Sequence, residues 1–218
     1  MQLIHTIEIN PYDFSNQEYN YPNGSSMESP DEWNQFWKKC ISDKNLGRLE
    51  SIRKGAYLVD IETINDDELV AVLKNELSEV ELFDVEEQVG KIIGGIALAE
   101  NNTIYMEPQC CGDIGNITEW ESIFENEWNV WNQLWIGHPW VYYRKNNGII
   151  EFTNYTESNP GDFKEVDILV KVVESDLQIE LKKIREQYNY FEYRIRKALD
   201  KMGIANAGQI SKLMTGNE

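Results

Sequence analysis

The chain has 218 residues, and its 38 acidic and 20 basic residues give it a formal net charge of −18. Hydrophobic residues make up 41% and aromatic residues 11% of the chain, which is enough to fill a core and excludes a largely disordered protein. No apolar run approaches the ~18 residues of a membrane-spanning helix. Because the chain is so acidic, we expect it to repel nucleic acids and anionic membranes and to attract cationic partners.

The cysteines and the N-terminus predict the compartment. Three cysteines, two of them adjacent at Cys110 and Cys111, do not form the pattern of a disulfide framework. Residues 1–5 lack the basic and apolar segments of a secretory signal. We therefore expect a cytoplasmic protein, and the length favours a single domain over residues 1–218.

Four segments have the patterns of strands and loops. Alternating apolar residues predict a first strand at 3–9, and a second strand follows at 56–64. Residues 10–29 between them are rich in Asn, Ser, Tyr and Pro, which is typical of a surface loop. Residues 166–173 form a nearly continuous β-branched run, which predicts a central strand buried on both faces.

Two β-hairpins are predicted from their turn residues, because Asn and Gly tolerate positive φ. The first joins 92–98 to 103–106 through Asn101-Asn102. The second joins 140–144 to 149–153 through Asn146-Asn147-Gly148.

Three helices begin at recognisable capping residues. Ser29-Pro30 opens a helix with an apolar face that includes Trp37. Asn65, followed by three acids, opens a second helix. Thr118-Glu119-Trp120-Glu121 has the form of a capping box, and apolar spacing predicts that the helix continues to Trp131.

The clearest element is a long amphipathic helix over residues 176–202. Its apolar residues recur at alternating spacings of four and three, and Gly203 is placed to end it. Core packing is the first interpretation of this stripe, and pairing with a second copy in a dimeric scaffold is the alternative. Residues 203–218 are expected to form a short helix or a tail. Together, these elements predict a single α+β domain with a mostly antiparallel sheet packed by helices.

The negative charge is concentrated in residues 60–127, which hold 18 acids against Lys74 and Lys91 and so carry −16. The other 150 residues carry only −2. Carboxylates are seldom buried without a partner, so we expect much of this charge on a shared surface. Solubility alone is the simpler explanation, and a cationic protein partner is the functional one.

The segment from Glu107 to Asp113 (EPQCCGD) has the densest set of reactive side chains. One cysteine as a nucleophile would need His5 or His138 as its base. Zinc binding by both cysteines and His138 is disfavoured, because adjacent cysteines do not match the usual ligand spacing. We therefore assign no catalytic residue, no metal and no cofactor.

Five tryptophans between residues 120 and 140 lie near acidic residues. Tryptophans with paired carboxylates are typical of carbohydrate-binding or hydrolytic pockets. A small-ligand pocket lined by Trp120, Trp128, Trp131 and Trp140 is therefore an alternative, and core packing is the simpler interpretation. The sequence contains no GxxxxGK[ST], HExxH or GxSxG motif.

Three motifs together resemble a small group of uncharacterised bacterial proteins. They are the 107–113 segment, Gly137-His138-Pro139-Trp140 and the hairpin from Ile149 to Tyr155, and the resemblance covers residues 104–157. Some members of that group resemble immunity proteins that neutralise polymorphic toxins. The resemblance implies a cytosolic protein that binds and blocks one toxin.

We therefore predict a non-enzymatic acidic binding protein, of immunity type, for a cationic protein partner. Its acidic surface would attract the partner electrostatically, and exposed tryptophans would anchor it. The candidate acidic residues are Asp66, Asp67, Glu68, Glu107, Asp113, Glu119 and Glu121. The candidate aromatic anchors are Trp120, Trp128 and Trp140.

Overall fold

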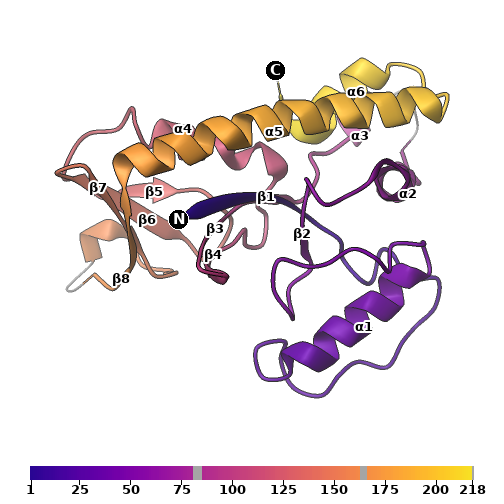
Figure 1. Cartoon of the computed structure of the whole chain (residues 1–218), viewed down its shortest axis with the longest axis horizontal. Coiled ribbons are helices and arrows are strands. Elements are labelled where there is room, and N and C mark those ends of the chain that lie inside the picture. Colours follow the sequence, from indigo (N-terminus) through magenta and orange to yellow (C-terminus); the bar gives the residue numbers. More distant parts are fainter. Residues whose placement is uncertain (81–84, 163–165, 218) are drawn as a thin grey trace. The chain divides into compact units, whose positions relative to one another are not determined.

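The computed structural model describes residues 1–80, 85–162 and 166–217 (Figure 1). These residues form six α-helices and eight strands. The strands belong to two four-stranded sheets, in the orders β2-β1-β3-β4 and β5-β6-β7-β8. The predicted α+β class is confirmed.

The chain divides into two compact units. Unit 1 comprises residues 1–5 and 93–188, and unit 2 comprises residues 6–92 and 189–218. Strand β1 (Gln2–Glu8) and helix α5 (Glu174–Lys201) each begin in unit 1 and end in unit 2. The single domain expected from the length stays a prediction.

The second sheet lies wholly in unit 1. Strands β6 and β7 form the hairpin predicted around Asn147 and Gly148, which both have positive φ. Strand β8 lies at the edge of the sheet, with three of its residues half-buried and Val173 45% exposed. The expectation of a central strand buried on both faces was therefore wrong. The four strands are β5 (Asn132–Leu134), β6 (Val141–Asn146), β7 (Ile149–Thr153) and β8 (Ile168–Val173).

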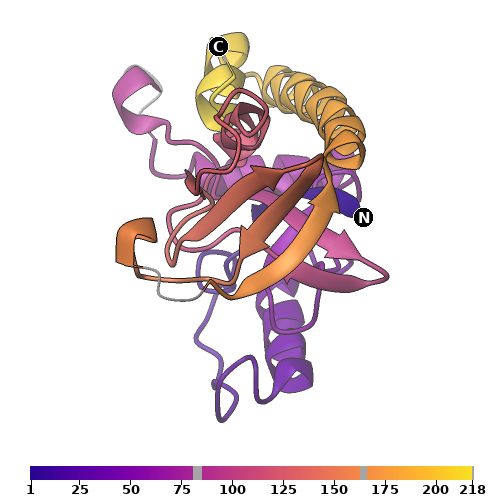
Figure 2. The same ribbon diagram turned by 90° about the vertical axis from the view of Figure 1, so that its left-hand side faces the viewer.

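The two faces of this sheet differ in character. Tyr143 and Phe152 pair across the strands and are fully buried on one face. On the opposite face, Glu151 accepts hydrogen bonds from Arg144 (2.6 Å) and pairs with Lys171 (2.7 Å). Those two bases hold the pKa of the Glu151 carboxyl below its usual value. In Figure 2 the strands of this sheet face the viewer, and β8 leads directly into α5.

Unit 1 also contains a hairpin and a short helix. The hairpin turns at Asn101 and Asn102, whose positive φ values confirm the turn expected from the sequence. Helix α4 ends at Ser122, so the predicted continuation to Trp131 was wrong. Thr118 is not its cap: Asn116 precedes the helix, and the Thr118 hydroxyl donates to the carbonyl of Gly115 (3.3 Å). These elements are β3 (Gly94–Glu100), β4 (Thr103–Met106), the 3-10 helices η1 (Ile114–Asn116) and η2 (Pro160–Asp162), and α4 (Ile117–Ser122).

Unit 2 holds most of the other helices. Helix α1 begins at Pro30 as predicted, and Trp37 on its apolar face is fully buried and donates to the carbonyl of Ile9 (2.7 Å). The strand expected over 56–64 is shorter, because only three residues pair with β1. The remaining elements are α1 (Pro30–Ser42), β2 (Leu58–Asp60), α2 (Asp66–Glu76), α3 (Val85–Gln88) and α6 (Ala207–Thr215).

Helix α5 ends within one residue of its predicted C-terminus, and Gly203 follows with φ +74. Its apolar stripe belongs to the core, because seven of its residues are at most 6% exposed. The stripe is therefore not an outer surface on which a second copy could pack. Those seven are Leu177, Leu181, Ile184, Tyr188, Phe191, Ile195 and Ala198.

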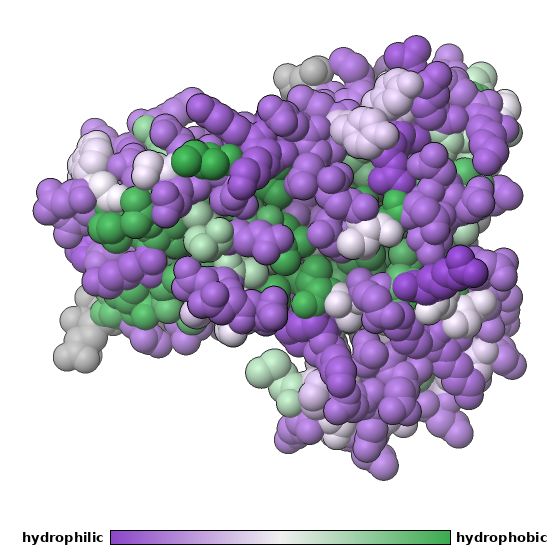
Figure 3. Space-filling model, viewed as in Figure 1, coloured by the Kyte–Doolittle hydropathy of each residue, from purple (hydrophilic) through white to green (hydrophobic). Residues whose placement is uncertain are grey.

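Apolar residues also reach the surface of unit 1. Figure 3 shows hydrophilic residues over most of the visible face, with apolar residues gathered over β7, β8 and the first turns of α5. Ile179 and Val173, both about half exposed, contribute to the apolar surface of these elements. Among the described residues, no helix is long and apolar enough to cross a membrane.

Candidate functional site

The acidic stretch of residues 60–127 is divided between the two units. Its first half, to Ile92, lies in unit 2, and its second half, from Ile93, lies in unit 1. The seven candidate carboxylates are therefore distributed three to unit 2 and four to unit 1. What each of them contacts decides whether it is available to a partner.

In unit 2, bases of α5 neutralise the two exposed candidate acids. Asp66 pairs with Arg194 (3.1 Å), whose side chain is only 12% exposed. Arg194 also donates to the backbone carbonyls of Ile61 (3.2 Å) and Ile64, so it is fixed in place. Asp67 lies 3.6 Å from Lys201. The Asp66–Arg194 pair links α2 to α5 and compensates the charge of Asp66, whereas both side chains of the Asp67–Lys201 pair are exposed, so that pair adds little to stability.

Glu68 serves the fold as well. Its side chain accepts a hydrogen bond from the backbone N–H of Asn65 (3.0 Å), while the Asn65 side chain accepts from the N–H groups of Asp67 and Glu68. This is a complete capping box at the start of α2. Because Glu68 is only 7% exposed, its assignment to a binding surface was wrong.

In unit 1, the four candidate acids have different roles. Glu121 accepts hydrogen bonds from Arg185 (2.9 Å to Nε), and this pairing raises the pKa of the guanidinium. Asp113 accepts from the N–H of Gly115 (2.8 Å) and caps η1. The backbone of Glu107 is fixed by the Tyr155 hydroxyl (2.8 Å). Glu119 is half-buried on α4.

Only one of the three candidate aromatic anchors is largely exposed. Trp120 is fully buried and its ring contacts Phe152, so its assignment as a surface anchor or as one wall of an open pocket was wrong. Trp140 is half-buried. Its backbone N–H donates to the carbonyl of Thr156 (2.9 Å), and its carbonyl accepts from the N–H of Thr156 (2.8 Å). Trp128, in contrast, is 54% exposed.

Trp128 belongs to a segment that we call the acidic loop, residues 123–131, which joins α4 to β5. The loop is fastened to β6, because the N–H of Asn129 donates to the carbonyl of Lys145 (2.8 Å). The ring of Trp128 lies over the ammonium of Lys145 (5.5 Å), and the ring of Trp131 lies over the guanidinium of Arg144 (4.7 Å). Since the side chains of consecutive residues of β6 point to opposite faces, the two tryptophans contact the strand on its two faces.

The acidic loop presents charge and apolar area together. Glu125 and Glu127 are exposed, and within the described structure neither forms an ion pair. Trp128 and Val130, at 54% and 47% exposed, lie next to them in the chain. Both acids belong to the acidic stretch of residues 60–127, but the sequence analysis did not select them as candidates. Nothing in the neighbouring sequence distinguishes them from acids that form an ion pair with a distant base.

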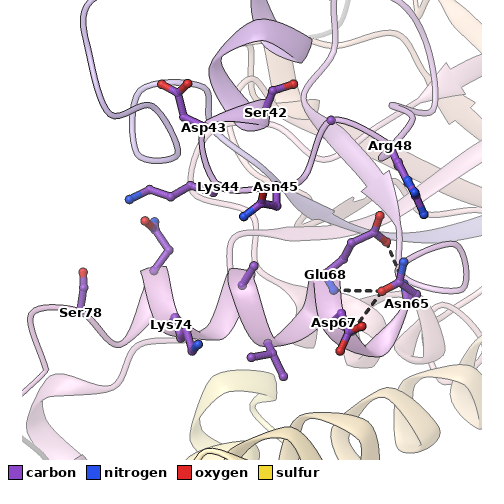
Figure 4. A pocket seen from close by; sticks show the side chains of 14 residues that line it. Ser42, Asp43, Lys44, Asn45, Arg48, Asn65, Asp67, Glu68, Lys74 and Ser78 are labelled. Atoms are coloured by element: carbon purple, nitrogen blue, oxygen red, sulfur yellow. Dashed lines mark hydrogen bonds between the residues drawn. The ribbon is translucent and has the colours of Figure 1, made fainter.

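Unit 2 contains an open cleft of about 980 Å³ between the α1–β2 connection and α2 (Figure 4). Three bases line it: Lys44, Arg48 and Lys74. Figure 4 shows Lys44 lying between the connection and α2, and Arg48 pointing toward Asn65 and Glu68. The rest of the lining is mainly amide, hydroxyl and carboxylate groups, without a tryptophan.

The bases and the acids of this cleft differ in how they are engaged. Asp43 accepts hydrogen bonds from the N–H of Asn16 (2.8 Å) and the hydroxyl of Tyr19 (2.9 Å). Asp67 lies next to Lys201, and Glu68 belongs to the capping box of α2. None of the three bases forms an ion pair among the described residues. Their N–H groups are therefore the donors available to a ligand, and they suit a small anionic, polar molecule.

The two units together define an α+β protein with a polar, base-lined cleft and an exposed acidic loop. No group of three or more His, Cys, Asp or Glu side chains arranged for a metal ion occurs in the described part of the chain. Comparison with protein-family models, with curated proteins and with solved structures gave no match.

Proposed function

We propose that this chain is a non-enzymatic binding protein that docks a cationic protein through the acidic loop of unit 1. One observation carries the proposal: Trp128 is 54% exposed beside Glu125 and Glu127, which have no basic partner among the described residues. Trp is among the residue types that dominate interface energies, and it does so when it enters a desolvated pocket of the partner.

The neighbouring charges add steering and selectivity. A carboxylate that is already paired with an arginine gains little from a partner's cation, because the internal pair must first be weakened. Glu125 and Glu127 have no such pair to lose, so a basic partner gains their full attraction. The contacts of the loop with β6 hold it in one conformation, which lowers the entropic cost of binding.

The chemical class of the partner is a basic protein. The resemblance of residues 104–157 to bacterial proteins of immunity type supports a toxin as that partner, and the acidic loop lies within this range. Action in the cytoplasm belongs to the same proposal and is supported by the cysteine pattern, three residues of which two are adjacent, which does not match a disulfide framework.

The test is affinity capture of the partner from the native cell with wild-type protein and matched variants. Trp128→Ala is expected to weaken binding by at least about 30-fold, which corresponds to a loss of about 2 kcal/mol at a hot spot. Glu125→Gln with Glu127→Gln is expected to slow association mainly at low salt.

Tyr190→Ala is the control for Trp128, because Tyr190 is similarly exposed (58%) but lies in unit 2. Glu32→Gln, an exposed acid in α1, is the control for the charge change. Equal loss of binding in the Tyr190 and Trp128 variants would refute the proposed surface, and so would binding that does not respond to salt.

A further inference from the structure

Cys110 and Cys111 are adjacent in the chain, and both are exposed. Their sulfur atoms lie 3.5 Å apart. Neighbouring side chains of an extended chain point in opposite directions, so this approach requires an unusual backbone. Cys111 supplies it, because its φ is +69, in the left-handed region that non-glycine residues seldom adopt.

Hydrogen bonds of unit 1 hold this backbone in place. The N–H of Gln109 donates to the carbonyl of Ile136 (2.8 Å), and the N–H of His138 donates to the carbonyl of Cys110 (3.0 Å). Beyond the pair, the carbonyl of Gly112 accepts from the N–H of Gly94 (3.1 Å). The strained residue is therefore bracketed on both sides by bonds to other segments.

Gly137 packs closely against the backbone of Cys110. A Cβ atom at Gly137 would lie 2.5 Å from the carbonyl oxygen of Cys110, so only glycine fits there. Strained backbone persists where the surrounding structure over-determines it, and such positions concentrate at functional sites. The third cysteine differs, because Cys40 is 2% exposed in α1.

We propose that Cys110 and Cys111 form a vicinal dithiol site, which exchanges with small disulfide oxidants of the glutathione class and closes reversibly into a Cys110–Cys111 disulfide. In the first step one cysteine thiolate attacks the oxidant's S–S bond, forms a mixed disulfide and releases one thiol. In the second step the other thiolate attacks the protein sulfur of the mixed disulfide and releases the second thiol. The protein loses two electrons and two protons, and the oxidant is reduced to two thiols.

Geometry explains why the closed form is easily reopened. Adjacent Cα atoms lie about 3.8 Å apart across a trans peptide, whereas the Cα atoms of a disulfide are usually roughly 4.4–6.8 Å apart. The ring therefore carries strain, and strained, exposed disulfides are the labile ones. The 3.5 Å sulfur separation places the second thiol within reach of the first, which favours ring closure over accumulation of the mixed disulfide.

The test treats the folded, full-length protein with oxidised glutathione and measures intact and peptide masses without reductant. Wild-type protein is expected to become two hydrogens lighter in the peptide that contains both cysteines, and to return to the dithiol with reduced glutathione. Cys110→Ser and Cys111→Ser are each expected to retain one glutathione at the remaining cysteine. Cys40→Ser is the control, and it should behave as wild type.

Persistence of glutathione adducts on wild-type protein at the level of the single variants would overturn the proposal. Disulfide-linked dimers in place of the internal ring would overturn it too. A second probe is a monosubstituted trivalent arsenical, which binds two thiols at once. Wild-type protein is expected to retain it at least about tenfold more tightly than Cys111→Ser, because the second thiol acts at high effective concentration. Equal retention would contradict the paired site.

Discussion

His5 gives the sharpest physical prediction, because it is a buried, neutral histidine in unit 1. Its Nε2 lies 2.8 Å from the carbonyl oxygen of Ile114, so Nε2 must carry the proton and donate it. Its Nδ1 is buried without a hydrogen-bond partner among the described residues. The ring stacks on Tyr188, with 5.3 Å between ring centroids. Protonation would place an unpaired N–H and a charge in this apolar setting.

Burial lowers the pKa of His5 from 6.5 to about 4; the hydrogen bond to Ile114 opposes the shift and the charge of Arg185 adds to it. The unfolded chain therefore binds a proton near pH 6.5, whereas the folded chain resists it until about pH 4. Between these values the unfolded state holds more protons, so stability falls as the pH falls. The full effect is about 3 kcal/mol, and about 2 kcal/mol of it is lost between roughly pH 7 and pH 5.

The assay is urea unfolding of wild type and His5→Gln at pH 7 and pH 5 and constant ionic strength. Gln keeps an N–H donor for Ile114 but does not titrate. Wild type is expected to lose about 2 kcal/mol more than the variant on acidification, a difference of roughly 1 M in urea midpoint for a slope of about 2 kcal/mol per M.

His138→Gln is the matched control, because His138 is the only other histidine and is exposed. It should keep the pH dependence of wild type. If His5→Gln loses as much stability as wild type on acidification, His5 is not the source of the effect. Comparing differences between two pH values cancels any constant cost of the substitution itself.

Two further predictions concern the cleft and the long helix. Pyrophosphate is expected to raise the thermal midpoint of wild type, and to raise that of Lys44→Gln by less. Lys54→Gln is the control and should respond as wild type, because Lys54 pairs with Asp31 outside the cleft. Equal shifts of the midpoint in all three proteins would argue against an anion site in the cleft. Ile184→Ala is expected to cost about 2–5 kcal/mol, and Ile179→Ala to stay within about 0.5 kcal/mol, because these residues are 1% and 55% exposed. Urea unfolding distinguishes them, and similar losses would contradict a core role for the stripe.

Local chemistry allowed much of the fold to be predicted from the sequence. The turns at Asn101-Asn102 and Asn147-Gly148 require positive φ, and the cap at Asn65 needs only residues within one helical turn. The length of α5 follows from an apolar period that is sustained along the whole helix, and glycine marks its end. None of these inferences needs information about distant segments.

The misjudged elements depend on contacts that are distant in sequence. Apolar spacing from Trp120 to Trp131 matches a helix, but Trp128 and Trp131 instead pack on two residues of β6, and Asn129 adopts a positive φ that interrupts any helix. The β-branched run at β8 has a neighbour on one side only, which composition does not reveal. The approach of the Cys110 and Cys111 sulfurs depends on the positive φ of Cys111, which lies in a turn closed by the N–H of Gly112 on the carbonyl of Gln109 (2.9 Å), and the identity of a cysteine does not predict such a φ.

Ion pairs between residues that are distant in sequence also change how the net charge of this protein is interpreted. Within unit 2, Arg194 reaches Asp66 across 128 positions of sequence, and within unit 1, Arg185 reaches Glu121 across 64. A net charge counts such carboxylates as if they were available, although they already stabilise the attachment of α5. A cationic partner gains most from carboxylates that have no internal base, since only their charge is uncompensated. Removing the paired acids from consideration moves the expected docking surface from the whole acidic stretch to the acidic loop.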